Sequence, residues 1–202
     1  MKIVIASENQ GKLHEIQAFF QSLPVTVVAQ SDFAVPSVEE TGLSFVENAI
    51  LKARHAAKYS QLPALADDSG LVVDALDGAP GIYSARYAGK GASMPDNIEK
   101  LLNDTRALPD NERLAHFFCA IAFVRHENDP VPIICQAQWD GLLLREPKGN
   151  KGFGYDPLFL IPQLECTAAE LSTEKKNELS HRAKALTLFV EAFLQAYPAN
   201  KQ

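Results

Sequence analysis

The chain has 202 residues, of which 47% are hydrophobic and 22% are charged, and its formal net charge is −6 at pH 7. This size and composition fit one globular domain, or two lobes that share a core. The acidic balance argues against a protein that coats nucleic acid, so no stable nucleic-acid partner is expected, although a few local cations suffice to bind a small anion. No apolar run reaches the length of a membrane span, and the chain opens on a strand-like run instead of a signal region. We therefore expect a cytoplasmic protein without membrane contact.

The three cysteines, Cys119, Cys135 and Cys166, are far apart, odd in number and without the spacing of metal ligands. Two of them fall in apolar, strand-like runs. We therefore expect buried, reduced thiols rather than a disulfide or a nucleophile.

Strand-like runs alternate with segments of helical periodicity in the first half of the chain. Proline closes the first helical segment, and a capping box at Ser44 begins the second. The acidic pair Asp67-Asp68 separates two short strand patterns. In chain order we expect a strand at 2–6, a helix closed by Pro24, a strand at 25–29, a helix from 44 to about 59, strands at 64–66 and 71–75, and a helix at 93–107.

The second half begins with two long strand patterns that are neighbours in the sequence. In the second of them apolar and polar residues alternate, as a strand with one polar face requires. The pair predicts an antiparallel hairpin and, with the interleaved helices, a mixed-sheet α/β protein. We expect strands at 114–125 and 131–144, a glycine-rich loop at 148–157, a strand at 158–161 and a helix from about 177 to 196.

The first polar segment that could carry chemistry is Ser7-Glu8-Asn9-Gln10-Gly11-Lys12, between a predicted strand and a predicted helix. A helix N-terminus presents backbone N–H groups to an anion, and Lys12 adds a positive charge. The segment is not a Walker A loop, because the first glycine of that pattern is missing. Alone, it is better explained as a turn with a solvated lysine.

Two pairs of adjacent acids, Glu39-Glu40 and Asp67-Asp68, form the strongest chemical signal. Each acid taken singly is typical of a surface charge, but Asp67-Asp68 ends an apolar run, where α/β proteins commonly bind ligands. Hard oxygen donors, with few cysteines and no histidine cluster, suit Mg²⁺ or Mn²⁺ rather than zinc. A carboxylate beside a metal can also orient or deprotonate a water. For Asp68 we therefore favour a functional role.

Lys52 falls one helical turn after Asn48 on the same face of the predicted helix 44–59. A polar outer face is the ordinary explanation of this pair. If the acidic loop, the stretch 35–42 that carries Glu39-Glu40, folds against the helix, however, Lys52 can reach a phosphate or a catalytic carboxylate.

Two later segments combine features that suit a flat or charged ligand. Gly152-Phe153-Gly154-Tyr155-Asp156-Pro157 is either a simple hairpin loop or a loop whose aromatic rings stack on a ligand. Ser180-His181-Arg182, with Lys175 and Lys176 upstream, is either a basic helix start, which the helix dipole disfavours, or a set of cations that faces an anion or a base edge.

Together these segments resemble the inosine/xanthosine triphosphate pyrophosphatase family, whose members degrade non-standard purine nucleoside triphosphates. The matches extend over nearly the whole chain in compatible order and spacing, which makes them specific although each one alone is weak. Ser7-Glu8 departs mildly from the Thr-Gly or Thr-Asn that the family often shows. The matching segments are 7–12, 39–42, 45–52, 66–70, 78–86, 153–156 and 180–182.

The resemblance implies one domain over residues 1–202, with an elongated mixed β-sheet flanked by helices and two lobes around a central substrate cleft. It implies a homodimer and a hydrolase that depends on Mg²⁺, with Mn²⁺ as a possible substitute. The implied reaction cleaves ITP, dITP or XTP to the nucleoside monophosphate and pyrophosphate, which cleanses the nucleotide pool and keeps these nucleotides out of DNA and RNA.

The resemblance also implies roles for individual residues. Asp68 is the expected proton acceptor and a metal ligand, Glu39 is the matched second metal carboxylate, and the shares of Asp67 and Glu40 stay open. Lys52 is expected to act in catalysis by holding the triphosphate. The expected substrate-binding residues are Ser7, Glu8, Asn9, Gln10, Gly11, Lys12, Ser69, Phe153, Gly154, Tyr155, Asp156, Lys176, His181 and Arg182.

Selection of a 6-oxo purine requires hydrogen-bond donors that adenine would leave unpaired, and His181, Arg182 or backbone N–H groups could supply them. Phe153 or Tyr155 would stack on the ring. Three alternatives stay open: a pyrophosphatase for pyrimidine or modified nucleotides, a catalytically silent nucleotide- or RNA-binding module, and a structural dimer whose acids are solvated.

Overall fold

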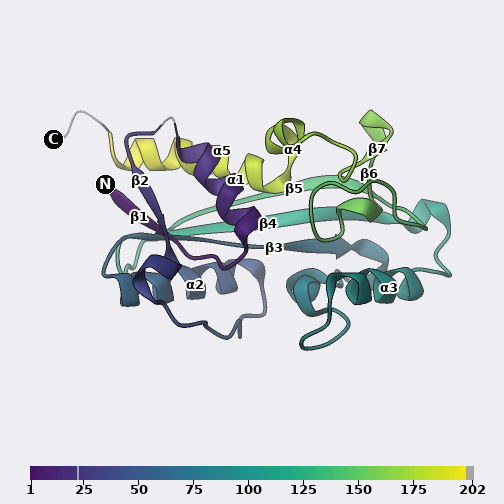
Figure 1. Cartoon of the computed structure of the whole chain (residues 1–202), viewed down its shortest axis with the longest axis horizontal. Helices are drawn as coiled ribbons and strands as arrows, with labels where there is room; N and C mark the ends of the chain where they lie inside the picture. Colours follow the sequence, from purple (N-terminus) through teal and green to yellow (C-terminus); the bar gives the residue numbers. More distant parts are fainter. Residues whose placement is uncertain (22, 199–202) are drawn as a thin grey trace. The chain divides into compact units, whose positions relative to one another are not determined.

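The structure, a computed structural model, describes residues 1–21 and 23–198, and of Gln10 it describes only the backbone. The strands of this part of the chain form a seven-stranded sheet in the order β2-β1-β3-β4-β5-β6-β7, with helices packed on it (Figure 1). The elements are β1 (Lys2–Ile5), α1 (Gln10–Phe20), β2 (Thr26–Ala29), α2 (Phe45–Ser60), β3 (Ala64–Val73), α3 (Met94–Asp104), β4 (Leu114–Val124), β5 (Ile133–Leu143), β6 (Phe159–Ile161), β7 (Cys166–Thr167), α4 (Thr173–Leu179) and α5 (His181–Ala196).

The sheet contains both strand orientations. β1 pairs in parallel with β2 and with β3, whereas β6 pairs antiparallel with β5 and with β7. The parallel pairs come from the interleaved half of the chain, in which helices connect the strands, as parallel pairing requires. The predicted mixed-sheet α/β fold is therefore confirmed.

The chain divides into two compact units. The first unit comprises Met1–Asp68, Cys119–Ala137 and Arg182–Gln202, and the second comprises Ser69–Phe118 and Gln138–His181. Each unit is thus assembled from segments that are distant in the sequence. The predicted substrate cleft and the single domain over residues 1–202 stay predictions.

The core of the first unit lies on one face of its strands. Leu13, Ile16 and Phe20 of α1 and Phe189 and Phe193 of α5 pack in one cluster of buried side chains with the strand residues. Figure 1 shows α1 and α5 on this side of the strands and α2 on the opposite side. The α2 face that packs inward is lined by small side chains, namely Ala49, Ala53, Ala56 and Ala57. Functional side chains that leave a strand of this unit therefore meet different helices on its two faces.

The second unit has a core of its own, in which aromatic rings dominate. Phe159 packs against Phe117 and Trp139 with ring-centroid distances of 4.6 and 5.3 Å. Leu101 of α3 and Leu158 are completely buried in the same cluster. The loop at 148–157 and helix α4 also belong to this unit.

Two predicted element boundaries were wrong. The two short strands predicted at 64–66 and 71–75 are replaced by the single ten-residue strand β3 over 64–73, in which residues 64–68, 70, 71 and 73 are buried. The predicted last helix is two helices, because Ser180 adopts an extended backbone (φ −66°, ψ 157°) between α4 and α5. A neighbouring strand on each side of β3 supplies backbone hydrogen bonds that the local pattern of charges does not reveal.

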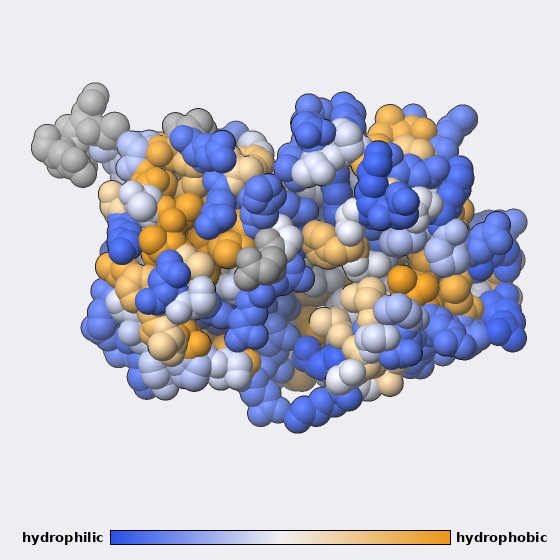
Figure 2. Space-filling model, in the orientation of Figure 1, coloured by the Kyte–Doolittle hydropathy of each residue, from blue (hydrophilic) through white to orange (hydrophobic). Residues whose placement is uncertain are grey.

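The remaining expectations concern the thiols and the surface. Cys119 and Cys135 are free and buried, as predicted, and Cys166 is free and partly buried. No helix in the described part of the chain is both long and apolar enough to cross a membrane. On the face drawn in Figure 2, hydrophilic residues are interspersed with smaller hydrophobic patches.

Candidate active site

The centre of the first unit's polar site is Lys52, on α2. Its Nζ donates hydrogen bonds to Oδ1 of Asp68 at 2.7 Å and to Oε1 of Glu40 at 2.9 Å. Asp68 is buried, and among the described residues none donates a hydrogen bond to its Oδ2. One lysine therefore brings a strand carboxylate and a loop carboxylate together and leaves one buried acceptor atom available to a ligand.

The acidic loop that carries Glu40 is attached to α2 at several points. The backbone N–H of Gly42 donates to Oδ1 of Asn48 at 2.8 Å, and Ser44 caps the helix by accepting from the N–H of Glu47. A Cβ at Gly42 would lie 2.7 Å from that Asn48 oxygen, so only glycine fits. Earlier in the loop, the carbonyl oxygen of Pro36 lies 2.8 Å from Nε2 of His55 on α2. The loop thus folds against the predicted helix, as the functional interpretation of Lys52 requires.

Asp67 and Asp68 serve different faces of the same strand. Successive side chains of a strand point to opposite faces, and Asp67 accordingly meets α1 and α5 whereas Asp68 meets α2. Nζ of Lys12 lies 3.0 Å from Oδ2 of Asp67, and Nε of Arg182 lies 3.2 Å from the same oxygen. Arg182 Nη1 also forms an ion pair with Glu15. The neighbouring carboxylates are therefore compensated by separate cations.

The two aspartates are shifted in opposite directions. Burial raises the pKa of Asp67, but Lys12, Arg182 and Lys52 outweigh it, so the pKa falls well below its usual range. At Asp68 burial dominates and raises the pKa in spite of Lys52. Burial lowers the pKa of Lys52, yet the carboxylates of Asp68, Asp67 and Glu40 together raise it above its usual value. Asp67 is thus a permanent anion, while Asp68 is the more basic carboxylate.

The predicted anion-binding segment forms the start of α1. Asn9 caps the helix, with Oδ1 accepting from the backbone N–H of Lys12 at 3.1 Å, and Ser7 Oγ accepts from the N–H of Asn9 at 3.3 Å. Glu8 and Gly11 are exposed, and the side chain of Gln10 lies outside the described residues. The first turn of the helix thus combines the positive end of the helix dipole with the Lys12 ammonium, a combination that suits phosphate.

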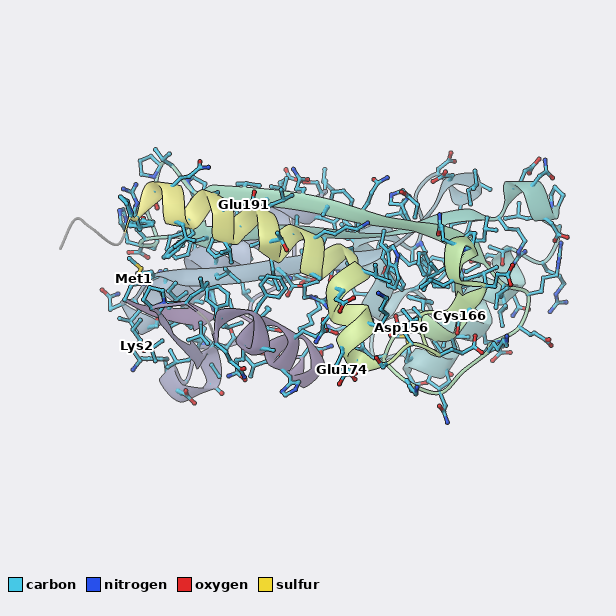
Figure 3. The ribbon with its side chains drawn as sticks, turned by 90° about the horizontal axis from the view of Figure 1, so that it is seen from above. Met1, Lys2, Asp156, Cys166, Glu174 and Glu191 are labelled. Atoms are coloured by element: carbon cyan, nitrogen blue, oxygen red, sulfur yellow. The ribbon has the colours of Figure 1, made fainter. Side chains whose placement is uncertain are left out.

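The second unit has its own cluster around Asp156. Figure 3 shows Asp156 beside α4, and Oδ2 of Asp156 lies 2.5 Å from Nζ of Lys176 on that helix. The same oxygen accepts from the N–H of Phe153 at 2.8 Å, and the Lys176 ammonium lies 4.3 Å from the Phe153 ring centroid. Gly152 allows this turn, because a Cβ there would lie 2.1 Å from Asp156 Oδ2. The buried ion pair of Asp156 and Lys176 therefore lies next to the partly exposed ring of Phe153.

Tyr155 and His181 are both buried against second-unit partners. Tyr155 is 2% exposed, and its hydroxyl donates to the carbonyl oxygen of Ser84 at 2.9 Å. The imidazole of His181 stacks on Phe117 at 4.9 Å with an interplanar angle of 15°. Of the two aromatic rings considered for base stacking, Phe153 is the exposed one, at 38%.

The structure brings many of the predicted site residues into contact, but it places Arg182 and Glu39 differently from what was expected. Lys52 and Asp68 are in contact, as are Lys12 and Asp67, and Phe153, Asp156 and Lys176 form one cluster. Arg182, expected near the base, contacts carboxylates of the first unit. Glu39 is exposed, whereas its neighbour Glu40 reaches Lys52.

Sequence reasoning missed Glu15 and Ser84. Glu15 lies one helical turn after Lys12, so this i,i+3 spacing was an available signal. Ser84 lies in the matched segment 78–86, to which no role had been given. Its hydroxyl accepts from the N–H of Leu71 at 2.9 Å, and its carbonyl accepts from Tyr155. No local pattern predicts these contacts, because they join residues far apart in the chain.

Comparisons with known proteins find relatives that match nearly the whole chain. Curated dITP/XTP pyrophosphatases from Shigella flexneri and Escherichia coli (strain K12) are each 52% identical to the chain over 191 residues, which cover 95% of this chain and 97% of each relative. The solved structure of a HAM1 protein from Coxiella burnetii has a TM-score of 0.91 at 50% identity and covers 96% of this chain and 99% of its own. The Ham1 protein of Staphylococcus aureus has a TM-score of 0.85 at 43% identity, with 97% and 99% covered.

The resemblance predicted from the motifs is thus confirmed by relatives that match nearly the whole chain. A model of the Ham1 family also matches residues 3–192, which include both polar clusters described above. This chain belongs to the Ham1 family.

Proposed function

We propose that this protein hydrolyses the non-standard purine nucleoside triphosphates dITP, ITP and XTP to the monophosphate and pyrophosphate. Relatives 52% identical over almost their whole length are named dITP/XTP pyrophosphatases. The observation that carries the proposal is the contact between Lys52 and Asp68, which leaves one buried carboxylate oxygen for a reactant. The role that we propose in the cell is to cleanse the nucleotide pool and to keep these nucleotides out of DNA and RNA.

We propose Asp68 as the general base. Its raised pKa makes it a better proton acceptor than an ordinary carboxylate. It takes a proton from a water whose oxygen forms a bond to the α-phosphorus. The bond from that phosphorus to the bridging oxygen breaks, and pyrophosphate leaves with the bond's electron pair. Lys52 holds Asp68 in place and stabilises negative charge on the phosphate oxygens.

The donor set fits Mg²⁺, with Mn²⁺ as a possible substitute. Within residues 1–21 and 23–198, no three His, Cys, Asp or Glu side chains gather into a group that could hold a metal ion by themselves. Mg²⁺ usually needs only one or two carboxylates together with substrate phosphates, and Oδ2 of Asp68, which is buried and accepts no hydrogen bond from the described residues, would supply one of them. Glu39, or Glu40 beside Lys52, would supply the second. When bound, the metal neutralises charge that develops on the phosphates.

The remaining residues divide into phosphate and base contacts. The start of α1 and Lys12 would bind the triphosphate, because both attract anions. Phe153 would stack on the purine ring, and Asp156, Lys176 and His181 would provide polar contacts near it. Tyr155, with its ring buried, would support this loop from behind.

The first test incubates the purified chain and Mg²⁺ with dITP, ITP, XTP, ATP, GTP and dTTP, and separates pyrophosphate from orthophosphate. We expect pyrophosphate from the first three and little turnover of the others. Orthophosphate would mean a different scissile bond, dTTP turnover would indicate a pyrimidine enzyme, and silence would favour a nucleotide-binding module. Omission of Mg²⁺ should abolish turnover, and Mn²⁺ should restore it.

A matched pair of variants tests the base. Asp68→Asn keeps the shape but loses the proton acceptor, and we expect kcat to fall at least about 10³-fold, since the base and the ligand oxygen are lost together. Asp77→Asn is the control, because Asp77 is exposed and its positive φ of 50° suits asparagine. Near-normal turnover by Asp68→Asn would remove Asp68 from this role.

We also propose a cytoplasmic homodimer whose partner is a small-molecule triphosphate. Sedimentation equilibrium of the full chain at micromolar concentration tests the assembly, and a single species with the mass of one chain would contradict it.

A further inference from the structure

We propose that Ser84 is a positioning residue for the nucleobase side of the site, and that it acts through Tyr155 on the loop that carries Phe153. The inference deepens the proposed function and rests on it. It gives a role to the matched segment 78–86, to which the sequence motifs assigned none.

The hydroxyl of Ser84 joins its own helical turn to strand β3. Ser84 lies in the short helical segment Gly81–Arg86, and its Oγ donates to the carbonyl oxygen of Gly81 at 2.7 Å. The same Oγ accepts from the backbone N–H of Leu71 on β3 at 2.9 Å. Ser69, an expected substrate-binding residue, precedes Leu71 by two positions on that strand. The hydroxyl therefore ties the segment to β3 close to an expected substrate contact.

A glycine lets β3 pass close to this hydroxyl. A Cβ at Gly70 would lie 2.4 Å from Oγ of Ser84 and 2.4 Å from the carbonyl oxygen of Gly81, so any larger residue would displace the segment. Farther along β3, the backbone N–H of Val73 donates to the carbonyl oxygen of Ala79 at 3.1 Å. The segment is thus fastened to β3 at two points, which fixes the position of Ser84.

The carbonyl oxygen of Ser84 holds the loop 152–157, which we call the base loop. It accepts from the hydroxyl of Tyr155 at 2.9 Å, and Tyr155 is 2% exposed. Burial raises the pKa of the Tyr155 hydroxyl well above its usual range, so this group stays a hydrogen-bond donor. On either side of Tyr155, the backbone N–H of Phe153 donates to Oδ2 of Asp156 at 2.8 Å. Tyr155 is therefore the side chain that connects this turn to Ser84.

One chain of contacts of the second unit thus runs from β3 through Ser84 and Tyr155 to the turn that presents Phe153. The proposed stacking on the purine requires the Phe153 ring to keep a fixed place relative to Ser69 on β3. The base is remote from the α-phosphorus, so its contacts are the same in the ground state and in the transition state. Loss of the link should therefore raise KM and leave kcat nearly unchanged.

Two variants that each remove one hydroxyl test the link. We expect Tyr155→Phe and Ser84→Ala each to raise KM for dITP about two- to tenfold, the range that one neutral hydrogen bond provides. The inhibition constant of the product dIMP should rise by the same factor, and kcat should stay within about twofold of the wild type. Pyrophosphate has no base, so its dissociation constant, measured by calorimetry, should not change. Because both hydroxyls serve one link, the double variant should raise KM by less than the product of the two single effects.

Tyr87 provides a matched control next to the same segment. Its hydroxyl donates to Oδ2 of Asp104 at 2.6 Å instead of to a carbonyl that faces the base loop. Tyr87→Phe therefore removes a phenolic hydrogen bond without breaking the link, and it should leave KM for dITP and the inhibition constant of dIMP unchanged. An unchanged KM in Tyr155→Phe, an equal rise in Tyr87→Phe, or an equal weakening of dIMP and pyrophosphate would overturn the proposal.

Circular dichroism and thermal unfolding of each variant identify a folding defect. If Ser84→Ala folds poorly, Tyr155→Phe carries the decision, since phenylalanine keeps the buried ring and loses only the hydroxyl. Failure of this inference leaves the wild type active and the Tyr155→Phe variant at the wild-type KM. Failure of the proposed function would look different, since the wild type would then release no pyrophosphate from dITP, and that result would overturn both.

Discussion

At the scale of single residues, the adjacent Asp67 and Asp68 have different surroundings, because a strand directs successive side chains to opposite faces. Asp67 is buried with Lys12 and Arg182, and Asp68 is held by Lys52 with one oxygen left to a ligand. The cations around Asp67 favour the charged form of its carboxylate, whereas at Asp68 burial outweighs Lys52 and favours the neutral form. Each direction of shift leads to a measurable dependence on pH.

The pH dependence of turnover should reflect Asp68. Its pKa lies above the ordinary 3.8, and the base acts only when ionised, so kcat should fall as the pH drops through that raised value. The pKa of Lys52 is raised above 10.5, so Lys52 stays charged on the alkaline side. The measurement is kcat for dITP from pH 4 to 9, with circular dichroism at each pH as the folding control. An acid limb at or below pH 3.8 would contradict the assignment.

The pH dependence of stability should reflect Asp67. A carboxyl whose pKa is lower in the folded state stabilises the fold above its unfolded pKa, and this contribution is lost as the pH falls towards the folded value. Asp67→Asn should therefore lower the free energy of unfolding at pH 7 by about 3–5 kcal/mol, as expected for breaking a buried pair. The difference from the wild type should shrink below about pH 4.

Urea unfolding at pH 7 and at pH 3.5 provides the measurement for Asp67→Asn. The control is Asp110→Asn, since Asp110 forms an exposed ion pair with Arg145, and such pairs contribute about 0–1 kcal/mol. An equal loss of stability at both pH values would mean that Asp67 acts through shape and not through charge.

At the scale of elements, helix α2 organises the first unit's site. Its N-cap, Ser44, ends the acidic loop, and Asn48 and Lys52 hold the loop at Gly42 and Glu40. Helix α3 has an equivalent cap at Ser93, which accepts from the N–H of Asp96, but it carries no proposed site residue. The two helices therefore offer matched caps of which only one lies beside the site.

Ser44→Ala and Ser93→Ala should each lower the free energy of unfolding by about 0.5–2 kcal/mol, because each removes one N-cap. Only Ser44→Ala should also reduce kcat/KM for dITP several-fold, since the acidic loop loses an attachment beside Glu40. Thermal unfolding and steady-state kinetics of both variants give the comparison. Equal kinetic effects would show that the loop is positioned without its cap.

At the scale of the whole molecule, each unit is built from separated segments. The chain passes from one unit to the other after Asp68, Phe118, Ala137 and His181. Neither unit is a continuous piece of chain, so neither can be completed before distant parts of the sequence are in place. We therefore expect one cooperative unfolding transition, with equal calorimetric and van't Hoff enthalpies.

Variants in the two cores test this cooperativity. Phe189→Ala changes the first unit and Phe159→Ala the second, and both residues are completely buried. Each should destabilise the protein by about 3–5 kcal/mol and shift the same transition in differential scanning calorimetry. Two transitions, each moved by only one of the variants, would contradict it.

The sequence by itself determined the mixed α/β class, most element positions and the buried thiols, and it supplied the residues that we propose for the chemistry. These follow from local periodicity, capping and motif spacing, which act over a few residues at a time. It did not predict that β3 continues through Asp67-Asp68, because partner strands far away in the sequence supply its hydrogen bonds. The break at Ser180 was also missed, although serine is a frequent N-cap.

Only the tertiary structure decided how the charges are paired. It directed Glu40, rather than Glu39, to Lys52, and it enclosed Arg182 between Asp67 and Glu15. These partners come from different elements, and a charge lowers its energy by whichever opposite charge the packing brings within a few ångströms. Residue types and their spacing therefore predict the chemistry available to this protein. The packing of β3 against α1, α2 and α5 decides which charged groups are paired.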